Sequence, residues 1–145
     1  MELITKSIDD LAKVVNFVAK MAVTPCLILL SGNLGFGKTT LTKKLFAHYG
    51  VKESEVKSPT YSLINSFSSQ SFDLNHLDLY RLENHDPYLM EEIKELINKK
   101  NSITVIEWPE KIDFSELEHQ DINIIKIKLE KLENDFRKVT IHVKN

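Results

Sequence analysis

Apolar residues in the first half of the chain follow first a helical and then a strand-like pattern. From residue 7 onward they recur every three or four positions, which predicts a helix that Ser7 caps and that ends before Thr24 and Pro25. This spacing is shown by Ile8, Leu11, Val14, Val15 and Val18. Residues 26–30 are apolar at every position, as expected for a strand covered on both faces in a parallel sheet. Residues 39–49 predict a second helix, with Gly50 as its C-terminal stop.

The second half of the chain predicts further strands and one more helix. Residues 61–67 and 72–80 indicate two strands, and the short polar segment 68–71 between them indicates a hairpin. Asp86 followed by Pro87 is typical of a helix start, and this helix should run to about residue 99. Residues 102–107 form a mostly apolar strand. Apolar and polar residues alternate over 123–130 and 138–143, which predicts a half-buried antiparallel hairpin near the C-terminus.

This order of elements predicts an α/β fold in one domain that spans residues 1–145. Strands separated by helices favour a three-layer sandwich whose sheet is parallel in the centre and antiparallel at its edges, together with a C-terminal hairpin. In such sheets ligands bind at the carboxyl ends of the parallel strands. Candidate functional residues should therefore lie where these strands end.

Composition and charge narrow the class of protein. With 145 residues, 42% of them hydrophobic and 28% charged, the chain is typical of a single globular domain. Its longest apolar run is far shorter than the roughly 20 residues of a membrane span, and its N-terminus lacks the pattern of a secretory signal. We therefore expect no membrane association and a cytoplasmic location. The formal net charge of -2 does not attract nucleic acid, so contact with RNA would need a local patch or a partner protein.

Glycine is concentrated in one loop. Of the four glycines, three lie within six residues, between the buried strand and the second helix. Residues 32–39 read GNLGFGKT and match GxxxxGK followed by Ser or Thr, in the strand and helix context that this motif requires. Backbone amides of such a loop and the N-terminus of the following helix bind phosphate. The sequence therefore predicts a P-loop NTPase-like fold with a nucleotide site.

Individual residues of this loop have separate expected roles. Lys38 would reach the β- and γ-phosphates of ATP, and the hydroxyl of Thr39 would bind the Mg²⁺ that bridges them. Thr40 is placed to donate to the α-phosphate. The expected nucleotide-binding residues of the loop are Asn33, Leu34, Gly35, Phe36, Gly37, Lys38, Thr39 and Thr40.

Two carboxylates near strand ends are candidate partners of the metal ion. Glu107 ends the apolar strand 102–107, and Asp78 lies near the end of the strand 72–80. A P-loop site needs a carboxylate at a strand end to hold or orient hydrated Mg²⁺. His76 shares a strand face with Asp78, and we interpret it as a structural support for Asp78 in preference to a catalytic base.

Two residues outside the loop are open between a functional and a structural role. Thr60 lies in a polar segment after Ser58 and Pro59, where many P-loop proteins have a segment that closes over the γ-phosphate. A simple proline-containing turn is an equal alternative. Trp108 follows Glu107, and a place in the core is as consistent with the sequence as a place at the site or at a partner surface.

Four segments taken together resemble one family. They read GNLGFGKTT over residues 32–40, SPTYSLIN over 58–65, HLDLYRL over 76–82 and VIEWPE over 105–110. Their order and spacing are similar to those of TsaE, also called YjeE, the small P-loop ATPase family of bacterial tRNA threonylcarbamoyladenosine synthesis. The resemblance covers residues 7 to about 111.

The resemblance implies a Mg²⁺-dependent ATPase that works with two partner proteins, TsaB and TsaD, in a cytoplasmic complex. TsaD is then expected to transfer the threonylcarbamoyl group to the adenosine next to the anticodon. The ATP cycle of the TsaE-like chain resets or regulates the complex, and tRNA is contacted only indirectly. By motif, Lys38 is the phosphate lysine, and Thr39 and Glu107 are the Mg²⁺ ligands. Asp78 is a supporting acid in the site, and Thr60 is the candidate switch residue.

The chain departs from the family pattern at three positions. Asn33 stands where the family usually has an acidic residue, so a carboxylate near the γ-phosphate is missing. Phe36 stands where a small residue is usual, which adds bulk to the loop. Leu11 aligns with a threonine that often lies near the nucleotide. In the C-terminal hairpin, Arg137 or Lys138 is a further candidate for contact with the nucleotide.

Two other functional classes stay open. A small-molecule P-loop kinase would transfer the γ-phosphate to a bound acceptor, but it would usually need an arginine-bearing lid, and the chain has few arginines. A nucleotide-sensing partner protein with negligible hydrolysis would be consistent with Asn33. A GTPase is disfavoured, because residues 98–101, NKKN, lack the aspartate of a guanine-reading NKxD motif.

Overall fold

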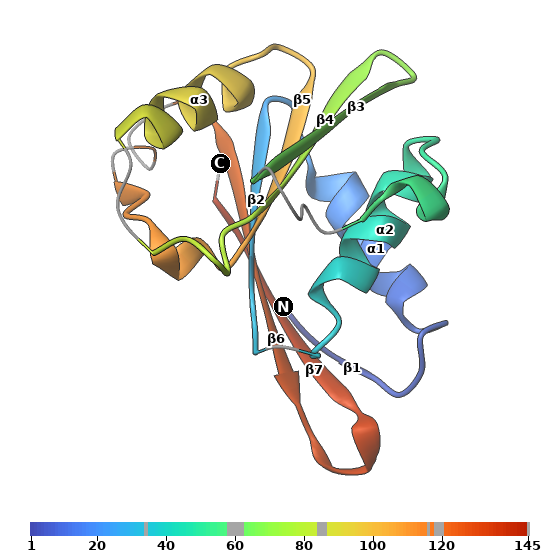
Figure 1. Ribbon diagram of the computed structural model, residues 1–145. Coiled ribbons are helices and arrows are strands. Elements are labelled where there is room, and N and C mark those ends of the chain that lie inside the picture. Colours follow the sequence, from blue (N-terminus) through green and yellow to red (C-terminus); the bar gives the residue numbers. More distant parts are fainter. Residues whose placement is uncertain (34, 58–62, 84–86, 116, 118–120, 145) are drawn as a thin grey trace.

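A seven-stranded mixed sheet forms the centre of the protein (Figure 1). The structure is a computed structural model that describes residues 1–33, 35–57, 63–83, 87–115, 117 and 121–144. The strand order is β1-β7-β6-β2-β5-β4-β3. Strands β6, β2, β5 and β4 are parallel to their neighbours within this group, and β1, β7 and β3 pair antiparallel at the edges. The strands are β1 (Glu2–Thr5), β2 (Cys26–Ser31), β3 (Ile64–Ser69), β4 (Phe72–Asp78), β5 (Ser102–Glu107), β6 (Asn123–Lys131) and β7 (Arg137–Lys144).

Helices cover both faces of this sheet. Figure 1 shows α1 (Leu11–Met21) and α2 (Lys38–His48) together on one face and α3 (Pro87–Ile97) on the other. The predicted α/β three-layer sandwich, with parallel strands in the centre and antiparallel strands at the edges, is therefore confirmed. Across the described ranges, the helices are all too short or too polar to cross a membrane.

Strand β2 is buried between the two helical layers. Ile28 and Leu30 belong to the hydrophobic cluster that includes α1 and α2, whereas Leu27 and Leu29 belong to the cluster that includes α3. Successive side chains of a strand point to opposite faces, so a strand covered on both sides is apolar at every position. This explains the uninterrupted apolar run, and it agrees with the place of β2 in the middle of the strand order.

The N-terminal segment differs from the prediction. Residues Glu2–Thr5 form the edge strand β1, which pairs with β7, and the first helix begins only at Leu11. Ser7 does not cap this helix: Asp10 is its N-cap, and Ser7 accepts a turn hydrogen bond from the Asp10 N–H instead. Ile8 is 62% exposed rather than packed inward. The chain must turn between β1 and α1, and this turn occupies the residues that the helical spacing included.

The remaining boundaries shift by a few residues. Gly50, with φ of 95°, follows α2 as predicted. The predicted hairpin is present, but β3 extends to Ser69, and the turn consists of Gln70 and Ser71, both with positive φ. Two positive φ values match the right-handed twist of a hairpin, and Gln-Ser is not the Asn-Gly pair that usually signals this turn. Strand β4 ends at Asp78, two residues before its predicted end. Asp86 lies outside the described residues.

Candidate functional site

The glycine-rich loop joins the carboxyl end of β2 directly to the N-terminus of α2. Gly32, Gly35 and Gly37 have φ of 147°, 76° and 99°, values that glycine adopts far more readily than other residues. Gly37 is the N-cap of α2 and supplies no side-chain hydrogen bond. The positive end of α2 therefore points to the loop without a side-chain cap, as expected where an anion takes that place.

Gly32→Ala is expected to destabilise the fold by about 2–4 kcal/mol, because the loop approaches β6 closely at this point. An added Cβ would lie 2.8 Å from the carbonyl oxygen of Leu129. Gly35→Ala is the matched control: no atom of the described residues lies within 4 Å of its added Cβ, so only backbone strain of about 1–2 kcal/mol is expected. Urea unfolding measures both losses, and equal losses would contradict the importance of this contact.

Lys38 folds back over its own loop. The side chain is only 5% exposed, and its Nζ donates to the carbonyl oxygens of Gly32 and Asn33. The same ammonium lies 4.2 Å from the centre of the Trp108 ring. Burial lowers the pKa of Lys38, while Glu107 and other nearby carboxylates oppose this shift. The ammonium therefore sits in the loop with weak acceptors that phosphate oxygens can replace.

The two candidate carboxylates meet at the same edge of the sheet. Asp78 on β4 is the register partner of Glu107 on β5, and Glu107 also pairs with Leu30 at the end of β2. The Thr39 hydroxyl, in the first turn of α2, is 3.3 Å from each carboxylate oxygen of Glu107. Parallel strands that end together thus bring the acid of β5 to the loop that follows β2.

Burial disfavours the charged form of Asp78. Burial is the main cause that raises the pKa of Asp78; the nearby Glu107 also raises it, and the N–H of Tyr80, which donates to Asp78 Oδ1 at 3.0 Å, lowers it. A raised pKa means that folding disfavours the ionised carboxylate. Asp78 therefore costs stability at neutral pH, which is typical of an acid held in place for function.

Asp78→Asn is expected to raise the thermal midpoint at neutral pH by about 1–3 °C, a small effect because the side chain is partly exposed. Because folding raises the pKa of Asp78, the wild type loses stability as the pH rises from the ordinary carboxyl pKa to the raised pKa. Below this pH range Asp78 is protonated in both the folded and the unfolded state, so the stability gained by the variant should disappear there. Asp113→Asn is the control of opposite sign, since hydrogen bonds from Ser115 lower the pKa of Asp113. Calorimetric melts across pH test this; a gain that persists in acid would contradict it.

His76 supports a different acid from the one predicted. It is fully buried on β4, and its Nε2 hydrogen-bonds Glu107 Oε2 at 2.5 Å. Its Nδ1 has no hydrogen-bond partner among the described residues. The interpretation of His76 as a support for Asp78 is thus corrected to Glu107, because the side chain reaches across to β5 and not along its own strand.

Trp108 lies at the site. It follows Glu107 with φ of 59°, just before the short 3₁₀ helix η2 (Pro109–Lys111). This left-handed conformation turns the chain sharply, and the indole ring then lies against the Lys38 ammonium and 5.0 Å from the Tyr80 ring, centre to centre. Both alternatives open from the sequence are therefore partly met: the ring lies at the site beside Lys38, and it also packs against the hydrophobic cluster that includes α3.

Two clefts meet at the loop. The first, with a volume of about 270 Å³, is lined by residues from the loop and from the ends of β4 and β5. Its lining residues are Gly35, Gly37, Lys38, Thr39, Thr40, Asp78, Glu107 and Trp108. Most of the residues predicted for phosphate and metal contact are therefore brought together around one cleft. Leu34 and Thr60 lie outside the described residues, and their roles stay predictions.

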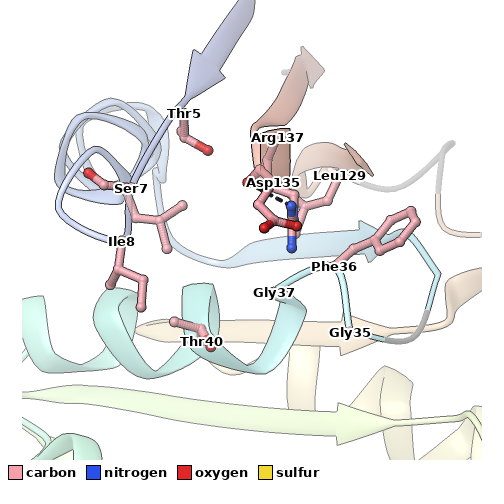
Figure 2. Close-up of a pocket in the computed structure, with 11 residues that line it drawn as sticks. Thr5, Ser7, Ile8, Gly35, Phe36, Gly37, Thr40, Leu129, Asp135 and Arg137 are labelled. Carbon is pink, nitrogen blue, oxygen red and sulfur yellow. Dashed lines mark hydrogen bonds between the residues drawn. The ribbon is translucent and has the colours of Figure 1, made fainter. Parts of the chain in front are cut away.

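The second cleft, of about 280 Å³, opens on the other side of the loop. Figure 2 shows its side chains coming from three directions: the end of β1 and the segment that follows it, the loop with α2, and the β6–β7 hairpin. Phe36 and Arg137 line it, and the Arg137 guanidinium lies 5.9 Å from the Phe36 ring centre. Thr40 lines both clefts. Arg137, one of the two hairpin residues predicted to contact the nucleotide, therefore lies near the loop. Lys138, the other, is not among the lining residues.

Several lining residues of the second cleft were missed by the sequence analysis. They are Thr5, Ser7, Ile8, Leu129 and Asp135. Leu11, which stands where the family often has a threonine near the nucleotide, also lines the cleft. No local pattern marks the others, because they reach the loop only through the pairing of β1 with β7 and the packing of β6 beside β2.

Comparison with known proteins agrees with the fold and the loop. The family model of the threonylcarbamoyl adenosine biosynthesis protein TsaE matches residues 5–139. A protein named tRNA threonylcarbamoyladenosine biosynthesis protein TsaE from Aquifex aeolicus is 33% identical over 144 residues, which cover 99% of this chain and 96% of that protein. The protein of the same name from Haemophilus influenzae is 34% identical, covering 77% of this chain and 74% of its own length.

A solved structure has the same architecture. The crystal structure of YdiB from Bacillus subtilis matches with a TM-score of 0.69 and 20% identity, covering 97% of this chain and 83% of that chain. At this identity the likeness concerns the fold, and it supports the P-loop-like α/β arrangement described above.

Proposed function

The chain belongs to the family of the threonylcarbamoyl adenosine biosynthesis protein TsaE, and from this premise we propose that it is a Mg²⁺-dependent ATPase of tRNA threonylcarbamoyladenosine synthesis. In this proposal it acts in the cytoplasm with TsaB and TsaD and contacts tRNA only through them. The observation that carries the proposal is the meeting of Lys38, Thr39 and Glu107 at one cleft. They supply the cation, hydroxyl and carboxylate that ATP with Mg²⁺ requires.

The donor atoms fit Mg²⁺. Two oxygen ligands at 2.0–2.1 Å and at right angles around the ion are separated by about 3 Å, and the Thr39 hydroxyl is 3.3 Å from the Glu107 oxygens. Mg²⁺ in phosphate sites takes one or two carboxylates, with phosphate oxygens and water in the remaining positions, so this pair suffices. When bound, the ion neutralises charge that develops on the β- and γ-phosphates.

Each of these residues has a separate role in this proposal. The Lys38 ammonium exchanges the Gly32 and Asn33 carbonyls for phosphate oxygens. Thr40 donates to the α-phosphate, and the uncapped N-terminus of α2 adds to this attraction. Asp78 is the second carboxylate of the cleft and orients water near the γ-phosphate. Thr60 is the residue that we propose as the switch over that phosphate.

Hydrolysis by the chain alone should be slow. Asn33 stands in the loop where the family usually has a carboxylate. The acids that line the first cleft, which is the phosphate cleft of this proposal, are Asp78 and Glu107. Catalysis of phosphoryl transfer depends mainly on positioning and charge stabilisation, so the partner proteins are expected to complete the site and stimulate turnover. A nucleotide-sensing role with negligible hydrolysis is the second candidate that Asn33 supports.

The second cleft suits a nucleoside. It adjoins the loop at Gly35, Gly37 and Thr40, so a nucleotide whose phosphates occupy the first cleft can extend its base and ribose into the second. The lining combines mostly apolar surface with a few polar groups, as small-molecule sites usually do. Phe36 and Leu129 offer apolar surface to a base, and Arg137 offers hydrogen-bond donors.

Arg137→Ala is expected to lower ATP affinity about 3- to 10-fold, the effect of losing one or two hydrogen bonds to the nucleotide. The affinity for inorganic tripolyphosphate should stay unchanged, because that ligand does not enter the second cleft. Lys131→Ala is the matched control, since Lys131 is the register partner of Arg137 and pairs with Asp135 but is not a lining residue. Calorimetric titrations measure both ligands; an equal loss for the two ligands would contradict this placement.

The function is tested by phosphate release from ATP with the chain alone, with TsaB, with TsaD and with both. Stimulation of about 10-fold or more by the two partners, absent in a Lys38→Ala variant, supports the proposal. ATP-dependent complex formation without phosphate release supports the sensing role. Transfer of the γ-phosphate to a small acceptor, with no effect of the partners, would contradict the proposal and favour a kinase.

A further inference from the structure

A buried histidine behind the phosphate cleft has no role in the function proposed above. His76 lies on β4 with 0% exposure, so it cannot touch a nucleotide in the cleft. Its ring is next to that of Phe46, which comes from α2, at 6.3 Å between centres and nearly perpendicular. Its polar contact is with Glu107, itself only 2% exposed. Among the described residues, the hydrogen bond by which His76 reaches the site is therefore the one to Glu107.

The contacts of Glu107 distinguish its two carboxylate oxygens. The Thr39 hydroxyl is 3.3 Å from both, so this contact alone leaves the rotation of the carboxylate undecided. His76 Nε2 contacts only Oε2, at 2.5 Å. A carboxylate that binds a metal ion is ionised and can only accept, so in that state the Nε2–H of His76 donates the hydrogen bond to Oε2. Oε2 is thereby engaged by the imidazole, and Oε1 is the oxygen left to face the cleft with the Thr39 hydroxyl.

Burying the imidazole of His76 at this position costs free energy. Its Nδ1 is buried without a hydrogen-bond partner among the described residues, and burying an unpaired polar atom costs free energy. An apolar side chain of similar size beside Phe46 would avoid this cost. What the imidazole contributes that an apolar side chain cannot is its Nε2–H bond to Glu107.

We propose that His76 is a positioning residue that fixes the Glu107 carboxylate, so that Oε1 and the Thr39 hydroxyl form the pair of protein ligands for a Mg²⁺ ion bound with the nucleotide. This inference rests on the proposed function of the site. Groups that orient a metal ligand typically change metal affinity 10- to 100-fold when they are removed. His76 should therefore affect the part of ATP binding that depends on Mg²⁺ and leave the remainder unchanged.

The test compares ATP affinity, measured by calorimetry, in Mg²⁺ and in EDTA. For the wild type, the ratio of the two affinities measures the contribution of the ion. His76→Leu and His76→Phe remove the donor and should lower this ratio about 10-fold, with ATP affinity in EDTA unchanged within about twofold. His76→Gln, whose amide N–H can donate to Glu107, should restore the ratio to within about threefold of wild type. In turnover assays with Mg²⁺ the donor-less variants should lose kcat, and their KM for ATP should rise in step with the lost affinity.

Thr104→Val is the matched control for a general loss of stability. It removes the buried hydrogen bond from Asn75 to Thr104 on the same two strands, and their side chains point to the opposite face from His76 and Glu107. This variant should melt at a lower temperature and keep the wild-type affinity ratio. A donor-less variant with the wild-type ratio, or a Gln variant with the low ratio of the Leu variant, would overturn the positioning role.

A measurement on the unaltered protein keeps the proposal testable if the variants do not fold. In ¹⁵N-histidine-labelled protein, the NMR signal of the proton on His76 Nε2 should stay protected from exchange with solvent when Mg²⁺ is added to the ATP complex, because this proton stays hydrogen-bonded to Glu107. Its loss on addition of Mg²⁺ would overturn the proposal. If the wild type did not bind ATP with or without Mg²⁺, the proposed function itself would be refuted. An unchanged affinity ratio in a variant that still binds ATP would refute only the role of His76.

Discussion

Lys38→Ala is expected to weaken ATP binding about 10- to 100-fold, because a hydrogen bond to a charged group contributes about 1.5–3 kcal/mol. Lys38 is the cation in the first turn of α2, and its ammonium lies in the phosphate cleft. Burial lowers the pKa of Lys38 and nearby carboxylates oppose this shift, so a phosphate partner would stabilise the charge further. Isothermal titration with ATP in Mg²⁺ measures the loss.

The matched control for this variant is another lysine of the same helix. Lys44 pairs with Glu53 at 3.6 Å on the surface and does not line either cleft, and such exposed pairs contribute little to stability. Lys44→Ala should therefore keep wild-type ATP affinity. Unchanged affinity in Lys38→Ala, with the fold intact by circular dichroism, would refute the assignment of the phosphate site.

Glu107→Gln is expected to reduce Mg²⁺-dependent turnover at least about 100-fold. The substitution keeps the shape and can still accept the hydrogen bond from His76, but it removes the negative charge that attracts the ion. ATP affinity in EDTA should be retained or slightly increased, because a carboxylate close to the triphosphate is lost. Phosphate release at increasing Mg²⁺ concentration, together with titrations in EDTA, separates the two effects.

Asp78 provides the comparison for Glu107. The two carboxylates are register partners on adjacent strands, but only Glu107 is hydrogen-bonded to Thr39 and His76 among the described residues. Asp78→Asn should therefore lower turnover without the loss of Mg²⁺ affinity expected for Glu107→Gln. If Glu107→Gln showed normal turnover with Mg²⁺, Asp78 would become the preferred ligand of the ion.

Much of the site could be predicted because its signals are local. The spacing of the loop glycines, Lys38 and Thr39 is set by the turn that a phosphate needs, so it is visible in eight consecutive residues. Glu107 could be placed because an apolar strand that ends in an acid carries this acid to the edge of the sheet. The register of β2, β5 and β4 then confirmed that these strand ends lie side by side.

Other features depended on contacts between distant parts of the chain. Strand β1 has only four residues and one neighbour, β7, which gives too short a pattern to recognise. The second cleft combines residues after β1 with Leu129 and Arg137 of the hairpin. For His76, the sequence indicated the correct strand face, but the neighbouring strand decided which acid it contacts.

The sequence by itself determined the fold class, the glycine-rich loop between β2 and α2 and the acids at the strand ends, because each follows from the periodicity or chemistry of a few consecutive residues. Only the tertiary structure decided that Trp108 lies over Lys38, that His76 holds Glu107, and that a second cleft adjoins the loop. These contacts depend on strand order, register and backbone turns, which bring together side chains that no local pattern relates.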